Sequence, residues 1–136
     1  MSDMKYSDAA GFICADCSNI DLGQCDVSRA LEEFDRAPWA RELEKFESLD
    51  GKRPTPCWPD LTYRIGKYHI GFMLESDLTT FRVEVCTPPK KRLFGIFNCT
   101  KFFQFNHVQP SQAKEYLEVF YTLSYSEQRE YYALQT

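Results

Sequence analysis

Two stretches in the middle of the chain alternate apolar and polar side chains, and this pattern constrains the fold more than any other feature. The apolar positions are Tyr68, Ile70, Phe72 and Leu74 in the first stretch and Phe81, Val83 and Val85 in the second. Because successive side chains of a β-strand point to opposite faces, the alternation predicts two strands, each with one buried face. The few residues between them fit a hairpin, so the strands are expected to pair antiparallel.

Three further segments extend this predicted sheet. Residues 93–97 and 102–105 are rich in Phe and are separated by a turn candidate at 98–101, which predicts a second pair of strands. Residues 61–65 can add an edge strand. The sequence therefore predicts an antiparallel sheet of three to five strands, a central meander within residues 61–105.

Helical spacing precedes this sheet region. Between residues 26 and 50, apolar residues recur three and four positions apart: Val27, Ala30, Leu31 and Phe34, then Trp39, Leu43 and Phe46. Asp26 or Ser28 can cap the start of the first helix. Pro38 suits the start of a second helix, or a kink in one continuous helix, that ends before Gly51. Residues 26–50 are therefore predicted to be helical.

The C-terminal residues 110–134 are also predicted to be helical. The apolar residues that follow Pro110 keep helical spacing: Ala113, Tyr116, Leu117 and Phe120. Ser124 and Glu127 have the spacing of a capping box, which predicts the start of a last helix. The five tyrosines of this region suit either a protein interface or helix-to-sheet packing.

Helices, then strands, then helices again indicate a segregated α+β fold, here an antiparallel sheet packed with N-terminal and C-terminal helices. At 136 residues the chain is expected to form a single domain, 1–136, with an irregular N-terminal segment at 1–25. No apolar run is long enough to span a bilayer, and the first residues show no secretory pattern. We therefore expect a soluble, cytoplasmic protein without a membrane partner.

Charged residues are distributed unevenly, although the net charge is only −4. Residues 1–50 hold 12 acidic and five basic side chains, whereas residues 51–108 hold four acidic and nine basic ones. Two outcomes are open. The acidic segment forms a negative face that attracts a basic partner, or the two segments neutralise each other within the fold. The acidic balance argues against direct binding of nucleic acid.

Six cysteines raise the question of a metal site. Cys14 and Cys17 have the CxxC spacing with which two thiolates reach one zinc ion, and Cys25 or Cys57 can complete the ligand set. A second CxxC pair or an HxxxH motif is missing, so the four cysteines make up only half of a zinc motif and no cofactor is expected. In a chain that is not exported, the thiols are expected to be reduced.

The sequence contains no catalytic motif, so an enzyme is not expected. A Cys–His pair can be assembled only by combining Cys57 or Cys86 with one of the two histidines, His69 or His107. Glycine-rich phosphate-binding loops are absent. The basic run at residues 90–92 can contact a phosphate, but a solvated loop end accounts for it as well.

Three segments give the chain a resemblance to a known group of proteins: the acidic helix with Trp39, the CWPDL segment from Cys57 to Leu61, and the C-terminal KEYLEVFYTLSYSEQREYYAL. The chain resembles the bacterial immunity proteins of contact-dependent growth inhibition and other polymorphic toxin systems. The resemblance implies a cytoplasmic protein that binds one cognate toxin domain, often a basic nuclease, and blocks it. It transfers no catalytic or binding residue, because that group contains many unrelated folds.

We therefore expect a non-enzymatic protein-binding module of the immunity type, with a zinc-stabilised small adaptor built on the N-terminal cysteines as the alternative. The expected partner is a basic toxin protein. The residues expected to face it are acidic side chains on predicted helices whose apolar positions already account for packing: Asp26, Glu32, Glu33, Asp35, Glu42 and Glu44.

Overall fold

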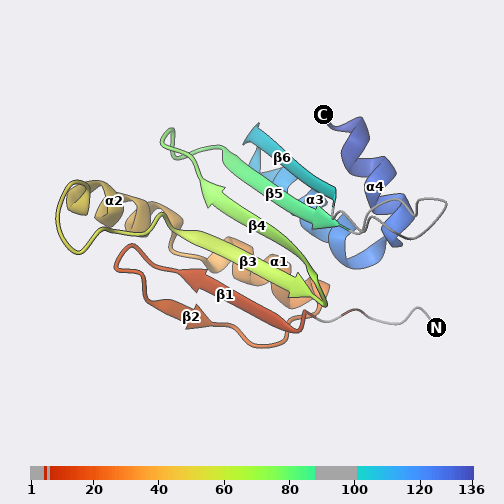
Figure 1. Ribbon diagram of the computed structural model, residues 1–136, viewed down its shortest axis with the longest axis horizontal. Helices are drawn as coiled ribbons and strands as arrows, with labels where there is room; N and C mark the ends of the chain where they lie inside the picture. Colours follow the sequence, from red (N-terminus) through yellow and green to blue (C-terminus); the bar gives the residue numbers. More distant parts are fainter. Residues whose placement is uncertain (1–4, 6, 88–100) are drawn as a thin grey trace, which may run out of the picture.

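The computed structural model describes residue 5, residues 7–87 and residues 101–136. Its strands form one antiparallel six-stranded sheet in the order β2-β1-β3-β4-β5-β6 (Figure 1). The strands are β1 (Ala9–Ile13), β2 (Asn19–Asp21), β3 (Asp60–Ile65), β4 (Tyr68–Leu74), β5 (Phe81–Thr87) and β6 (Lys101–Val108). The helices of the described residues are α1 (Val27–Arg36), α2 (Trp39–Leu49), α3 (Pro110–Thr122) and α4 (Tyr125–Leu134). The α+β class predicted from the sequence is confirmed.

These helices all pack against the same face of the sheet. In Figure 1, α1 and α3 lie behind the strands. Each helix places an aromatic ring against a ring from that face: Phe34–Phe72 from α1, Trp39–Phe12 from α2, Tyr116–Phe105 from α3 and Tyr132–Phe103 from α4. The fold therefore has two layers, with the core between the helices and one side of the sheet.

The alternating stretches that open the sequence form the middle of the sheet. β4 and β5 pair antiparallel through a short connection, as predicted, with Phe72 opposite Val83 and Ile70 opposite Val85. All four of these side chains are fully buried. Burial of apolar area on this scale is the main stabilising contribution to such a core.

Two buried tyrosines of the core, Tyr63 and Tyr132, donate their hydroxyl groups to backbone carbonyls. The hydroxyl of Tyr63 donates to the carbonyl of Ala30 at 2.8 Å, and that of Tyr132 donates to the carbonyl of Tyr116 at 2.7 Å. A buried hydroxyl without a partner is costly, so these bonds let large polar-tipped rings fill the core. Three of the five C-terminal tyrosines, Tyr116, Tyr121 and Tyr132, are buried, so packing rather than an exposed interface accounts for them.

The helix boundaries follow the predicted caps. The side chain of Asp26 accepts the backbone N–H of Arg29 at 2.8 Å, and Ser124 and Glu127 form the capping box at the start of α4. Ala37 and Pro38 separate α1 from α2, so the segment 26–50 is two helices and not one kinked helix. Within the described chain, no helix is both long and apolar enough to cross a membrane.

The number of strands corrects the prediction, because the sheet has six strands instead of three to five. The two additional strands, β1 and β2, lie in the segment 1–25 that was expected to be irregular. β1 pairs with β3 along its whole length, from Ala9 opposite Arg64 to Ile13 opposite Asp60. β1 depends on backbone pairing with β3, and β2 depends on pairing with β1, rather than on hydrophobic patterns of their own. The strand expected at 93–97 and the basic run at 90–92 lie outside the described residues.

Candidate functional site

The face of the sheet that points away from the helices is not covered by any helix of the described chain. Figure 1 looks onto this face. We define the open face by these residues of the five longer strands: Ile13, Asp60, Thr62, Arg64, His69, Gly71, Met73, Arg82, Glu84, Cys86, Phe102 and Gln104. Antiparallel sheets with helices on one side commonly leave the other side to solvent or to a partner.

A row without large side chains crosses the middle of the open face. The row begins at Gly11 of β1 and continues through Thr62 of β3 to Gly71 of β4. It ends at Glu84 of β5, which is the residue opposite Gly71. A Cβ atom at Gly71 would lie 3.4 Å from Thr62 Oγ1 and 3.7 Å from Asp60 Oδ1, so these two side chains lean over the glycine. Near Gly11 the surface is hollowed by about 380 Å³. This hollow is lined by residues of β1, β2 and β3, and at Gly11 the side chain of Asn19 lies so close that a Cβ atom would be 2.6 Å from its Oδ1 atom.

Hydrogen bonds order the polar side chains of the open face. The Nη2 atom of Arg82 lies 2.7 Å from Glu84 Oε1 and 3.1 Å from Gln104 Oε1, which spans β5 and β6. The hydroxyl of Thr62 donates to Asp60 Oδ1 at 2.6 Å. Burial raises the pKa of Asp60, the hydrogen bond from Thr62 opposes this shift, and the charge of Glu84 adds to it. Asp60 is not among the residues predicted from the sequence. The sequence shows only that its carboxylate lies one residue before a predicted strand.

Apolar side chains lie at both sides of these polar groups. Phe102 on β6 is 52% exposed and Ile13 on β1 is 37% exposed, while Met73 on β4 is half-buried between them. These side chains lie apart on β1, β4 and β6, so they flank the polar groups without forming one apolar patch.

One of the cysteine and histidine combinations considered from the sequence is brought together here. Cys86 of β5 is directly opposite His69 of β4 on the open face. No hydrogen bond between the two side chains is found among the described residues. Cys57, the other candidate nucleophile, is bonded to another cysteine.

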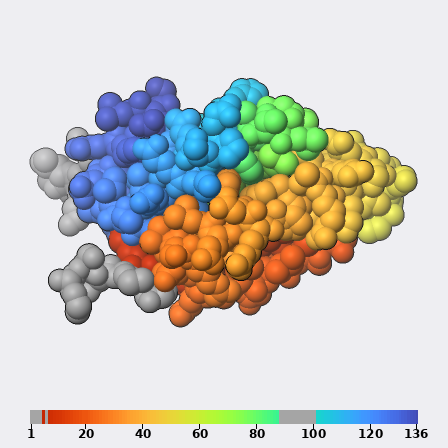
Figure 2. Space-filling model, turned by 180° about the vertical axis from the view of Figure 1, so that it is seen from behind, coloured from red at the N-terminus to blue at the C-terminus, as the bar shows by residue number. Residues whose placement is uncertain are grey.

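The acidic side chains proposed to face a partner are mostly paired with basic neighbours. Glu32 lies 4.0 Å from Arg36 and Glu33 lies 3.9 Å from Arg29, both within α1. Asp35 lies 3.2 Å from Lys114, which joins α1 to α3; Figure 2 shows these helices side by side. Asp26 caps α1, and Glu44 is exposed on α2. Local neutralisation therefore accounts for much of the acidic charge of α1.

Glu42 lies inside the protein, although it was expected on an exposed helix face. It is only 3% exposed, and its Oε1 atom accepts the backbone N–H of Ala15 at 3.2 Å. Lys45 Nζ and Arg41 Nε lie 3.3 Å and 3.7 Å from its Oε2 atom. These contacts tie α2 to the turn between β1 and β2, which is a structural role.

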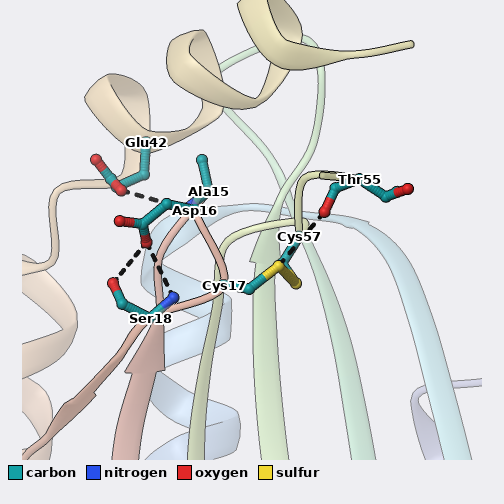
Figure 3. The surroundings of a disulfide bond; sticks show 7 residues. All are labelled: Ala15, Asp16, Cys17, Ser18, Glu42, Thr55 and Cys57. Atoms are coloured by element: carbon teal, nitrogen blue, oxygen red, sulfur yellow. Dashed lines mark hydrogen bonds between the residues drawn. A yellow bond between two sulfur atoms is a disulfide. The ribbon is translucent and has the colours of Figure 1, made fainter. Parts of the chain in front are cut away.

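A disulfide bond joins Cys17 of the same turn to Cys57 of the loop after α2 (Figure 3). The expectation that the thiols are reduced is wrong for this pair. The backbone N–H of Cys57 also donates to the carbonyl of Ala15 at 3.0 Å, so the two segments are in contact around the bond. Sequence analysis grouped both cysteines with a half zinc motif, because spacing along the chain does not reveal which thiols meet in space.

The other two cysteines of the half motif remain thiols. Cys14 is half-buried in the turn and Cys25 is buried before α1. Among the described residues, no group of three or more His, Cys, Asp or Glu side chains is arranged to hold a metal ion. The arrangement of the four cysteines is therefore a cross-link with two separate thiols.

Comparison with protein-family models, with curated proteins and with solved structures finds no match for this chain. The features of the chain that bear on its function are therefore the geometry of the open face and of the cysteine cluster.

Proposed function

We propose that this chain is a non-enzymatic protein-binding module, an immunity protein that binds a cognate toxin domain in the cytoplasm and blocks it. The observation that supports this proposal most is the open face of the sheet. All described helices lie on the opposite face, so the open face is free to receive another protein. The hollow near Gly11 suits a convex part of that partner's surface.

The size of the open face suits a protein partner. Six strands spaced about 4.8 Å apart, with three to eight residues each, give a surface of roughly 24 by 20 Å. A standard protein interface buries about 800 Å² on each partner. The open face together with the side chains at its edges is large enough to supply most of such an interface.

The chemistry of the open face also suits a protein partner. Arginine, methionine and aromatic residues are enriched at protein interfaces. Arg64, Arg82, Met73 and Phe102 provide these side chains on neighbouring strands. The guanidinium group of Arg82 is already held by its neighbours, so binding costs less side-chain entropy there.

Charge supports a basic partner. Asp60 is half-buried and has no ion-pair partner among the described residues, so it offers a carboxylate to a basic side chain of the toxin. The acidic helices contribute at longer range, because residues 1–50 keep their excess of acidic residues even though several of them are paired locally.

The proposal is tested with the toxin domain encoded by the reading frame next to this gene. We expect the purified proteins to form a complex and the toxin to lose its activity. Phe102→Asp replaces an exposed aromatic side chain on the β6 side of the proposed interface with a charge and is expected to weaken binding at least tenfold. Leu134→Asp is the matched control, because Leu134 is 82% exposed near the end of α4. Both variants should keep the melting temperature of the wild type.

A second set of variants tests the acidic helices. Reversing Glu32, Glu33 and Asp35 together to Lys changes the net charge from −4 to +2. We expect slower association with a basic toxin at low salt and a smaller effect at high salt, since exposed charges are screened over about 8 to 10 Å.

If Phe102→Asp binds the toxin as tightly as the wild type does, the open face is not the binding surface. The absence of any complex rejects the immunity function.

A further inference from the structure

Three of the cysteines lie together where the turn at residues 14–18 contacts the loop at 51–59. Cys17 and Cys57 form the disulfide, with their Cα atoms 5.1 Å apart (Figure 3). Cys14 is a free, half-buried thiol in the same turn as Cys17. Cys17 therefore has a second thiol close to it along the chain, in addition to the one to which it is bonded.

The backbone of the turn brings Cys14 near Cys17. The N–H of Cys17 donates to the carbonyl of Cys14 at 2.9 Å, which is the hydrogen bond of a four-residue turn. Such a turn holds its first and last Cα atoms within about 7 Å. Disulfides span Cα separations of about 4.4 to 6.8 Å. The separation that the turn imposes on Cys14 and Cys17 therefore overlaps the range in which a disulfide can form.

We propose that Cys14, Cys17 and Cys57 form a thiol–disulfide exchange site, in which Cys14 replaces Cys57 as the partner of Cys17. The Cys14 thiol loses its proton and its sulfur attacks the Cys17 sulfur. A bond forms between Cys14 and Cys17 as the Cys17–Cys57 bond breaks, and Cys57 leaves as a thiolate that takes up a proton. One thiol and one disulfide remain, so the step consumes no oxidant or reductant.

The surroundings of Cys14 affect the rate of this exchange through the pKa of its thiol. Burial raises the pKa of the Cys14 thiol, the charges of Glu42 and Asp16 add to the shift, and a hydrogen bond with Ser18 opposes it. The ammonium group of Lys45 lies against Glu42 and weakens the effect of that carboxylate. The attacking thiolate is therefore scarce at neutral pH, and exchange is faster in alkaline solution.

Exchange changes how the loop at 51–59 is held. The covalent link between this loop and the turn is lost, whereas two other contacts stay: the N–H of Cys57 to the carbonyl of Ala15, and the indole N–H of Trp58 to the carbonyl of Leu74 at 3.1 Å. Residues 51–55 are exposed. The exchange therefore loosens one loop and leaves the sheet intact.

The test is differential alkylation of the purified full-length protein without reductant. Free thiols are labelled with iodoacetamide under native conditions, the disulfides are then reduced, and the released thiols receive a second, isotopic label before peptide mapping by mass spectrometry. We expect the first label on Cys14 in some molecules and on Cys57 in others. Labelling of Cys57, relative to that of Cys86 as a reference thiol, should be faster at pH 9 than at pH 7.

Two variants separate internal exchange from other reactions. In Cys14→Ser, Cys57 should remain unlabelled. Cys86→Ser removes another half-buried thiol and should leave labelling of Cys57 unchanged, as should tenfold dilution. Unlabelled Cys57 in the wild type, or equal labelling of Cys57 in wild type and Cys14→Ser, overturns the proposal. If Cys14→Ser does not fold, a non-reduced digest of the wild type decides: the proposal fails if it contains no Cys14–Cys17 linked peptide.

Discussion

At the scale of single residues, Val83 tests the packing of the sheet against the helices. It is fully buried in β5, between Phe72 of β4 and Phe105 of β6. Val83→Asp puts an unpaired carboxylate there, which costs several kcal/mol against a typical total stability of about 5 to 15 kcal/mol. We expect the variant to be unfolded at 25 °C, as measured by circular dichroism and urea denaturation.

The neighbouring strand position gives a control for Val83→Asp. Gln104 is exposed on the open face of β6, so Gln104→Asp introduces the same charge without burying it. This control should unfold within about 0.5 kcal/mol of the wild type. A cooperatively folded Val83→Asp protein with an unchanged midpoint would show that the buried face of β5 is assigned wrongly.

Asp60 predicts a pH dependence of stability. Because burial raises its pKa in the folded protein above the unfolded value, the folded state binds the proton more tightly. Asp60 therefore destabilises the fold above its folded pKa, and this penalty disappears as the pH falls to the unfolded value of about 3.9. Asp60→Asn keeps an acceptor for Thr62, so it should be more stable than the wild type at pH 7 but not at pH 4.

The pH series for Asp60→Asn is measured by urea denaturation between pH 4 and 7. Asp21→Asn is a suitable control, because Asp21 is exposed on the edge strand β2 and accepts a local backbone N–H. A stability difference between Asp60→Asn and wild type that stays constant over this range would contradict the account of Asp60.

Glu42 shows how a sequence signal at one residue was misinterpreted. It stands three positions after Trp39 and one before Leu43, on the same stripe of α2 that faces the core. The helical spacing was read from apolar residues alone, so a carboxylate in the stripe was assigned to solvent. A charged residue at a stripe position indicates a buried partner, here the backbone N–H of Ala15.

At the scale of elements, the disulfide makes a large contribution to the stability of the N-terminal half. It closes a loop of sequence separation 40 that contains β2, α1 and α2. Loop closure of this length reduces the entropy of the unfolded chain by an amount worth about 4 kcal/mol. The Cys17→Ser, Cys57→Ser double variant should lose up to that amount in urea denaturation, whereas Cys86→Ser should change little. Equal stability of wild type and double variant would contradict this role.

Periodicity predicted the elements that bury a regular stripe or face. β4, β5, α3 and the cap of α4 follow from alternating or helical spacing and from capping residues. β1 and β2 did not follow, because β2 has three exposed residues and β1 has five residues that include Gly11. β2 pairs with β1, and β1 pairs with β3, which lies about 50 residues later in the chain, so no local pattern predicts that pairing.

At the scale of the whole molecule, all described helices lie on one face of the sheet, and the proposed binding surface is the other face. The order of elements predicted an α+β fold but not which side of the sheet stays uncovered. The acidic residues of α1, which the sequence suggested as the site, are paired with Arg29, Arg36 and Lys114. The candidate site is instead the open face, whose residues come from strands far apart in the sequence. Only the register of the strands brings these residues together.

The most direct test of the central claim is methyl NMR of the labelled protein titrated with the proposed partner, a toxin domain to be sought in the adjacent reading frame. Ile13 and Met73 report on the open face, and Val27 and Leu31 report on α1. Our account predicts that the signals of Ile13 and Met73 shift or broaden on binding while those of Val27 and Leu31 stay in place. Changes confined to Val27 and Leu31 would contradict it and would place the partner on the helices.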